Sequence, residues 1–287
     1  MPQNKEEFDF LGISRWHELG IKGQGITIAS RERMTEHGSN VFDIIRQVCP
    51  EANIRIDVEY DEDSDWDIYT TSLFFPSDNY ESNQNRIKEL NAKGKILFCA
   101  AGNSGNENCT SATKADMLSV GACKLKNGKP QLASYSSRCE HLDFVSFSDL
   151  YTEYSDNKAI NGTSFSAPLF AGMVCLIQCY FLQTIGRKIT YNELLEYLIK
   201  NSVDMGEKGR DDNYGYGLLI LPELEENMEI KLRINSKLAH VNGKEVMLDT
   251  EPIIHCNRTM VPLRFIAETF GCNVEWNEKE REVTIVK

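Results

Sequence analysis

Long apolar stretches are missing from the sequence. Nowhere do about 18 apolar residues follow one another, and the N-terminal segment MPQNKEEFDFLGISRW has no basic region before an apolar run of roughly 7–15 residues. We therefore expect neither a membrane-spanning helix nor a signal peptide. The expected location is cytoplasmic, with extracellular residence after lysis or nonstandard release as the alternative.

Positive charge is also scarce. The 31 Lys and Arg side chains stand against 43 Asp and Glu side chains, so the formal net charge is −12. Such a chain repels phosphates, and we expect no nucleic acid and no membrane among its partners. The acidic run at residues 57–67 is typical of a solvated loop, although roughly three or four of its carboxylates could hold a structural calcium ion. No other metal and no organic cofactor is expected.

Closely spaced cysteine pairs of the CxxC type are absent too. The nine cysteines form an odd set, which favours a reducing compartment over a disulfide framework. Cys175 and Cys179 lie one helical turn apart and could be half of a metal site, but no neighbouring His or Cys completes it. Buried packing is the expected role of both thiols.

What the sequence does contain is a set of short strands and helices in alternation. Residues 26–29 and 96–101 are short apolar runs followed by turn-forming residues, and residues 85–95 have a helical pattern closed by Gly94. Residues 164–183 form a nearly all-apolar helical stretch, which is normally central and buried. These patterns predict an α/β fold with one sizeable core.

The composition changes near residues 221–229, where an acidic segment with a proline precedes a β-rich tail. We expect two domains, residues 1–225 and residues 229–287. The second contains a hairpin turn at Asn242-Gly243, an apolar helix around 261–270 and a short terminal strand, and is predicted to be a small α+β unit.

The strongest chemical signal is the segment NGTSFSAPLFAG at residues 161–172. It presents the Ser164 hydroxyl where a turn enters the long apolar helix, and free N–H groups at a helix start favour developing negative charge. The segment alone would equally suit a helix cap with Pro168 in the first turn. Two further segments favour chemistry: His37-Gly38-Ser39 before a helical pattern, and Ala100-Ala101-Gly102-Asn103 after a strand.

These three segments together resemble the subtilisin family of serine proteases over roughly residues 14–224. The resemblance implies a subtilisin-like parallel sheet sandwiched by helices, with peptide bonds as the substrate. It implies that Ser164 is the nucleophile, that His37 is the general base and that Asn103 donates to the oxyanion. In isolation, an Asn-Ser-Gly turn would explain Asn103 equally well.

The family's catalytic aspartate is replaced. The matching strand pattern starts at Gly25 and ends at Glu32, so a glutamate occupies the place of the acid. Its extra methylene moves the carboxylate by about 1 Å, which can cost on the order of a hundredfold in rate. Only four residues separate Glu32 from His37, a span of at most roughly 17 Å. Glu36 is the competing acid, and a solvated position near the helix start explains it more simply.

The residues expected to bind the substrate lie in two segments. Ser72, Leu73 and Phe74 resemble the family's edge that pairs with the substrate backbone, and Ala100, Ala101 and Gly102 belong to the segment that resembles the family's strand and loop before the oxyanion-hole asparagine. Phe74 and Phe75 stand where the family has glycines, so the groove is expected to be narrowed or walled by apolar rings.

Residues 229–287 resemble the stalk module named after the N-terminal domain of copper amine oxidases, through VNGK, Pro252, RTMVPLRFIAE and GCNVEWNEKEREVTIVK. His240, His255, Cys256 and Cys272 have no metal-ligand spacing, so no copper site is expected. The resemblance implies an attachment or spacer role with an unidentified partner.

The sequence thus predicts a subtilisin-like serine endopeptidase. An alternative is a catalytically impaired subtilase that serves as a binding or regulatory scaffold, suggested by Glu32 and by the two phenylalanines. A third hypothesis gives the main task to the C-terminal module, with the protease-like domain trimming the linker near 221–229.

Overall fold

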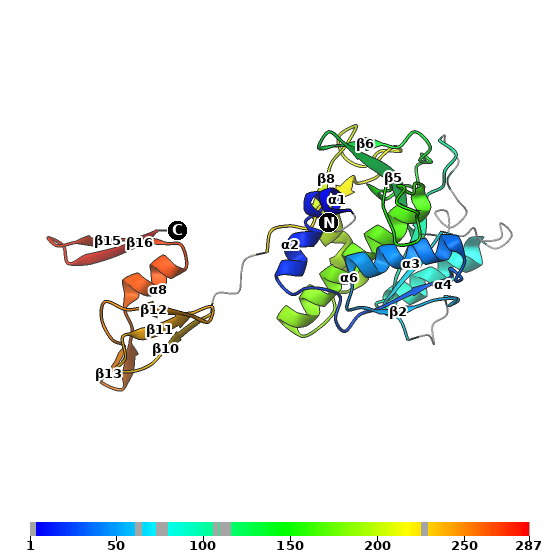
Figure 1. Ribbon diagram of the computed structural model, residues 1–287. Helices are drawn as coiled ribbons and strands as arrows, with labels where there is room; N and C mark the ends of the chain where they lie inside the picture. Colours follow the sequence, from blue (N-terminus) through cyan, green and yellow to red (C-terminus); the bar gives the residue numbers. More distant parts are fainter. Residues whose placement is uncertain are drawn as a thin grey trace. The chain divides into compact units, whose positions relative to one another are not determined.

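The computed structural model describes residues 4–60, 65–72, 80–105, 109, 116–224 and 229–286. The chain divides into two compact units, residues 1–224 and residues 225–287. Each unit is described separately, with the labels of Figure 1.

A nine-stranded, mostly parallel sheet forms the centre of the larger unit (Figure 1). The order is β2-β1-β3-β4-β5-β7-β9-β8, and only β8 and the side strand β6 run antiparallel to their neighbours. The strands are β1 (Thr27–Ser30), β2 (Asn53–Arg55), β3 (Ile68–Thr71), β4 (Ile96–Ala100), β5 (Leu118–Lys126), β6 (Lys129–Leu132), β7 (Phe144–Phe147), β8 (Ser202–Val203) and β9 (Leu218–Leu219). Because the carboxyl ends of parallel strands share one edge, the segments after β1, β3 and β4 converge there.

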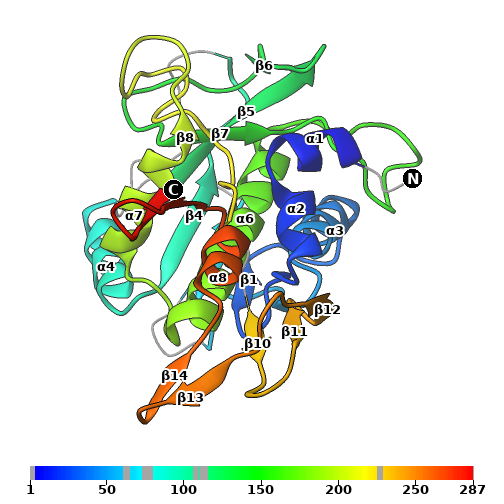
Figure 2. The ribbon, with the colours of Figure 1, turned by 90° about the vertical axis from the view of Figure 1, so that its left-hand side faces the viewer.

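Helices cover both faces of this sheet (Figure 2). Alternate strand residues point to opposite sides: Ile28, Ile68 and Phe98 join the core beneath α3 and α6, whereas Tyr69 and Leu97 pack toward α4. The helices of this unit are α1 (Lys5–Phe10), α2 (Ile13–Glu18), α3 (Glu36–Val48), α4 (Tyr80–Ala92), α6 (Thr163–Ile185) and α7 (Tyr191–Lys200). The predicted parallel α/β architecture is therefore confirmed.

Helix α6 is the central helix of the core. Its 23 residues pack against α3 and five strands of the sheet, and its first 17 positions are buried apart from Ser164. By length and composition it is also the one helix of the described residues that would suit a membrane span, but 83% of that stretch is buried within the unit. The predicted buried helix at 164–183 is thus confirmed.

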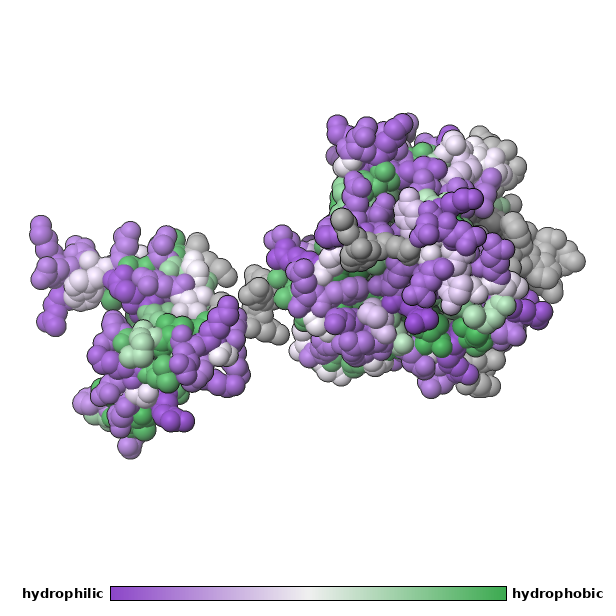
Figure 3. All heavy atoms as spheres, in the orientation of Figure 1, coloured by the Kyte–Doolittle hydropathy of each residue, from purple (hydrophilic) through white to green (hydrophobic). Residues whose placement is uncertain are grey.

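The smaller unit is an α+β fold, as predicted. It contains a three-stranded sheet, two hairpins and one helix: β10 (Ile230–Leu232), β11 (Leu238–Val241), β12 (Lys244–Met247), β13 (Ile253–His255), β14 (Arg258–Met260), α8 (Leu263–Thr269), β15 (Asn273–Asn277) and β16 (Glu282–Val286). Asn242 and Gly243 turn the β11–β12 hairpin with φ of 50° and 77°, the left-handed pair that an Asn-Gly turn provides. Many large apolar side chains of this unit are half-exposed, and apolar residues are visible on its surface in Figure 3.

The cysteines depart from the expectation drawn from their odd number. Cys109 and Cys139 form a disulfide, which sequence spacing did not reveal because the two residues lie 30 positions apart. Cys175 and Cys179 are buried thiols, in line with their expected packing role. Within the described parts of the chain, no three His, Cys, Asp or Glu side chains cluster as a metal site would require.

Candidate active site

Ser164 lies in the first turn of α6, and the local sequence explains why the helix starts there. Gly162 precedes the helix with φ of 133°, a backbone conformation that residues with a side chain rarely adopt. Pro168 has no N–H, so the Ser164 carbonyl four residues earlier lacks its helical partner. The Ser72 hydroxyl donates to that carbonyl at 3.0 Å, which ties the end of β3 to the start of α6.

His37 lies in the first turn of α3, close after the end of β1. The Thr35 side chain caps the helix by accepting from the Gly38 N–H at 3.1 Å. Gly38 allows the chain to fold back tightly, because a Cβ at this position would lie only 1.8 Å from the Arg33 carbonyl oxygen. This tight connection brings His37 next to Glu32.

Glu32 is only 3% exposed, and its carboxylate has two partners among the described residues. Its Oε2 lies 3.3 Å from Nδ1 of His37, and its Oε1 accepts from the Ser72 backbone N–H at 3.1 Å. A carboxylate held in this way fixes the proton of His37 on Nδ1 and leaves Nε2 as the acceptor. Glu36, the competing acid, is exposed at the start of α3.

The His37 ring also lies beside the turn that carries Ser164. Its centre is 5.4 Å from the ring of Phe165, the residue that follows Ser164. The hydrogen bonds of the described residues do not include one between the Ser164 hydroxyl and His37. In enzymes without bound substrate such contacts are often longer and tighten when the substrate binds.

Asn103 follows β4 and reaches the residue just before Ser164. Its Oδ1 accepts from the Thr163 backbone N–H at 2.9 Å and from the Thr163 hydroxyl at 3.1 Å. The same hydroxyl accepts from the Gly102 N–H at 3.0 Å, so the fully buried Thr163 joins the two segments. With Oδ1 occupied, the orientation of the amide is fixed and its Nδ2 is left as a donor. Sequence reasoning did not single out Thr163, although a hydroxyl residue beside the candidate nucleophile was a usable signal.

The predicted substrate-binding residues lie partly in the described structure. Leu73 and Phe74, like Phe75, lie outside the described residues. Ala101 is buried and its N–H donates to Val120 O at 3.0 Å, and Ala100 is buried as well. Gly102 accepts from the Ser137 N–H at 2.9 Å. The contact of these residues with a substrate stays a prediction.

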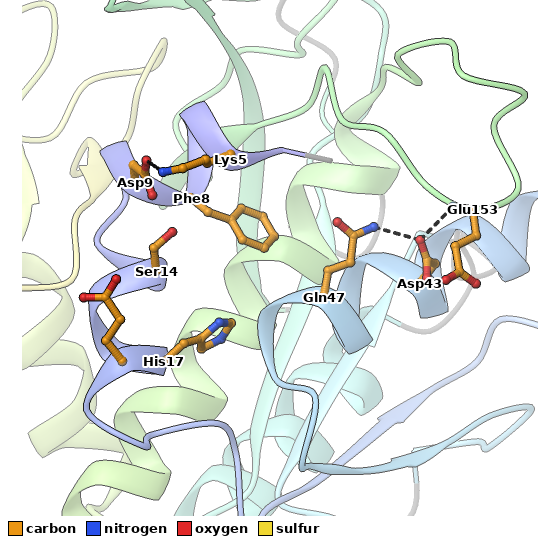
Figure 4. Close-up of a pocket in the computed structure, with 9 residues that line it drawn as sticks. Lys5, Phe8, Asp9, Ser14, His17, Asp43, Gln47 and Glu153 are labelled. Carbon is orange, nitrogen blue, oxygen red and sulfur yellow. Dashed lines mark hydrogen bonds and ion pairs between the residues drawn. The ribbon is translucent and has the colours of Figure 1, made fainter. Parts of the chain in front are cut away.

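A separate cavity of about 500 Å³ lies between α1, α2 and α3, and none of the residues discussed above lines it (Figure 4). Phe8, His17 and Gln47 face it from these helices, together with several carboxylates. His17 donates from Nε2 to the Val48 carbonyl at 2.7 Å, and burial lowers the pKa of His17.

Two family models match the chain, and together they span most of both units. The sequence model described as the Subtilase family matches residues 38–217, which is more than half of the chain. This match starts one residue after His37 and therefore does not include Glu32. The model described as the copper amine oxidase N-terminal domain matches residues 224–285.

Three curated relatives are proteases. The chain is 28% identical over 240 residues to the minor extracellular protease Epr of Bacillus subtilis, covering 72% of this chain and 36% of the relative. It is 26% identical over 182 residues to the major intracellular serine protease of the same organism, covering 60% and 56%. It is 28% identical over 169 residues to the intracellular serine protease of Paenibacillus polymyxa, covering 56% and 50%. The chain thus spans about a third to just over half the length of these relatives.

A solved structure agrees in fold. The crystal structure of a lanthipeptide protease superposes with a TM-score of 0.61 at 17% identity, covering 75% of this chain and 92% of that one. At this level of identity the likeness concerns the fold.

Proposed function

Since the chain belongs to the subtilase family, we propose that it is a serine endopeptidase in which Glu32, His37 and Ser164 form the catalytic triad and Asn103 the oxyanion hole. The observation that carries this proposal is the contact between Glu32 and His37, 3.3 Å apart beside the Ser164 turn. Chain order supports it as well, because acid, histidine and serine follow one another in the order of subtilisins.

In the proposed reaction the Ser164 hydroxyl attacks the carbonyl carbon of a peptide bond. His37 takes the hydroxyl proton on Nε2 and later gives it to the leaving amine. Glu32 holds the ring through Nδ1–H and stabilises the imidazolium that forms, without itself becoming protonated. Its burial supports this role, because a carboxylate shielded from water acts more strongly on a nearby positive charge.

Asn103 would stabilise the negative oxygen of the tetrahedral intermediate. Its amide is oriented in advance by the two Thr163 hydrogen bonds, so Nδ2 is not free to turn away. Donors fixed in this way are worth about 3–4 kcal/mol in the transition state.

The substrates that fit this proposal are peptides or proteins. The C-terminal unit would then be an attachment or spacer module, as its resemblance implies. A cytoplasmic location remains a proposal, since two of the relatives are named intracellular and one extracellular.

The proposal is tested by labelling the purified protein with a fluorophosphonate probe, which reacts with activated serines. We expect the wild-type chain to be labelled and Ser164→Ala to remain unlabelled. Ser166→Ala is the matched control, because Ser166 lies two residues further along the same helix and has no hydrogen-bond partner among the described residues. A folded wild-type chain that is not labelled would contradict the proposal and favour the scaffold alternative.

A further inference from the structure

Tyr135 contacts both segments on which the proposed chemistry depends. It lies between β6 and β7, and its carbonyl accepts from the Gly105 N–H at 2.9 Å. Its hydroxyl accepts from the Gly162 N–H at 3.0 Å. Gly105 follows Asn103 by two residues, and Gly162 precedes Ser164 by two residues. Tyr135 therefore bridges residues 102–105, called here the oxyanion loop, and residues 162–164, called here the nucleophile turn.

The direction of the hydroxyl hydrogen bonds follows from the donors available. The Ser148 hydroxyl donates its only proton to the Cys123 carbonyl at 3.2 Å, and the Gly162 N–H can only donate. Tyr135 therefore donates to Ser148 Oγ, at 2.6 Å, and accepts from Gly162. The resulting chain of hydrogen bonds runs from Gly162 through Tyr135 and Ser148 to β5 of the central sheet.

The ring of Tyr135 is held from a second side. Lys124 Nζ lies 5.4 Å from the ring centre and pairs with Asp149 at 2.9 Å. Burial raises the pKa of Tyr135, so its hydroxyl keeps the proton that it donates to Ser148. Both ring and hydroxyl are thus fixed relative to the sheet.

The two backbone segments that Tyr135 holds contain glycines in unusual conformations. Gly162 has φ of 133° and Gly105 has φ of 67°. Glycine moves easily between conformations, so a turn that starts at glycine needs an outside contact to stay in one of them. The oxyanion loop has further anchors, because Ser104 N–H donates to Ser137 Oγ at 3.2 Å and Ser137 N–H donates to Gly102 O at 2.9 Å. The Gly162 N–H is held by the Tyr135 hydroxyl.

We propose that Tyr135 is a positioning residue that keeps the Ser164 hydroxyl and the Asn103 amide in register with each other. This inference rests on the proposed function of those two residues. Tyr135 acts through the Gly162 backbone and takes no part in proton transfer. Because reacting groups must be placed to well within 1 Å, loosening the turn lowers the rate of acylation more than it weakens binding of the substrate.

The test compares Tyr135→Phe with Tyr69→Phe. Tyr69 is a matched control, because its hydroxyl also makes a hydrogen bond to the backbone, donating to the Val58 carbonyl at 3.0 Å. Its ring, however, packs toward α4 on the other face of the sheet. We expect Tyr135→Phe to lower kcat on a peptide substrate and the fluorophosphonate labelling rate by about tenfold to a hundredfold, with KM within about twofold of wild type. Tyr69→Phe is expected to lower thermal stability by about as much as Tyr135→Phe does and to leave kcat unchanged.

A second variant keeps the test decisive if Tyr135→Phe does not fold. Ser148→Ala retains Tyr135 but removes the acceptor of its proton, and should lower kcat with KM unchanged. The positioning role is overturned if the kcat of Tyr135→Phe lies within twofold of the kcat of Tyr69→Phe. If Tyr135→Phe does not fold, the kcat of Ser148→Ala is compared in its place. Either result leaves the proposed triad intact. A wild-type chain that the probe does not label overturns both.

Discussion

At the scale of single residues, the most informative contact is that between Glu32 and His37. The longer glutamate side chain was expected to displace the carboxylate and to slow the reaction. In the structure this carboxylate reaches the Ser72 N–H at 3.1 Å and the His37 ring at 3.3 Å. The glutamate therefore contacts both partners from its place after β1, and a shorter aspartate would withdraw from both.

We accordingly predict that Glu32→Asp lowers the labelling rate by about tenfold to a hundredfold, since the carboxylate retreats by about 1 Å. Glu32→Gln should lower it further, by roughly a thousandfold or more, because the amide can hold the wrong tautomer of His37. Labelling kinetics at a fixed probe concentration measure both effects. Faster labelling of Glu32→Asp would mean that glutamate is the poorer acid at this site.

His17 predicts how stability depends on pH. Burial lowers its pKa, so between that lowered value and 6.5 the unfolded chain binds more protons than the folded one. Stability should therefore fall as the pH decreases through this window. His17→Gln can still donate to Val48 O but does not titrate, and should reduce that loss.

The measurement is the urea midpoint at about pH 7.5 and about pH 5.5. His255→Gln serves as the control, because His255 is exposed in the other unit. If His17→Gln loses as much stability on acidification as His255→Gln, burial of His17 is not the cause.

The sequence predicted the identities of the candidate site residues but not their contacts. Ser164, His37 and Asn103 stand in short motifs whose residue types and order can be recognised without a structure. Thr163 contacts Asn103, and Tyr135 contacts Gly162, through hydrogen bonds across 60 and 27 positions of the chain, which no local pattern contains. Glu32 lies between these cases, since its place in the motif could be read from the sequence but its hydrogen bond with the Ser72 N–H could not.

At the scale of elements, the N-terminal turn of α6 lacks one helical hydrogen bond, and a side chain from outside the helix replaces it. Pro168 removes the hydrogen bond that the Ser164 carbonyl would otherwise accept, and Ser72 at the end of β3 replaces it. Ser72 thus contacts both the start of α6, through its hydroxyl, and the Glu32 carboxylate, through its backbone N–H. A proline four residues after Ser164 thus leaves a carbonyl that the serine at the end of β3 can bond.

Ser72→Ala is therefore expected to lower the free energy of unfolding by about 1–2 kcal/mol, because the Ser164 carbonyl is left without its partner. Ser166→Ala removes a hydroxyl that is buried without a partner among the described residues, and should be neutral or slightly stabilising. Urea unfolding of the two variants measures the contrast. Equal effects would show that the Ser72 hydrogen bond contributes nothing.

Element types followed from the sequence more reliably than their ends. The pattern at 85–95 predicted a helix closed by Gly94, and α4 ends at Ala92 but starts earlier, at Tyr80. The apolar run at 164–183 became α6, because a helix that is apolar on all sides is stable only inside a core. Strand pairing was implied by the family resemblance and could not be worked out from the short apolar runs alone.

At the scale of the whole molecule, the segment before the second unit belongs to the core of the first. Leu221 N–H donates to Leu11 O at 2.9 Å, and Trp16 Nε1 donates to Pro222 O at 2.9 Å. Leu224 is buried in the same core. These contacts close the α1–α2 segment onto the end of the larger unit.

We predict that a chain ending after Leu224 keeps its thermal stability within a few degrees and its labelling rate within about twofold, because the larger unit has its own core. A chain ending after Gly217 lacks β9 and the contacts of Leu221 and Pro222, and should not fold. Circular dichroism and probe labelling distinguish the two. Loss of labelling in the first chain would mean that the C-terminal unit is needed for activity.

The redox state of Cys109 and Cys139, which form a disulfide in the structure, depends on the compartment in which the protein resides. Disulfides persist in oxidising compartments and are rare where glutathione and thioredoxin keep thiols reduced. Blocking free thiols at the moment of cell lysis, followed by intact-mass measurement, would count how many thiols had been free. Nine free thiols would indicate a reducing compartment, whereas seven would indicate that the protein had been in an oxidising one.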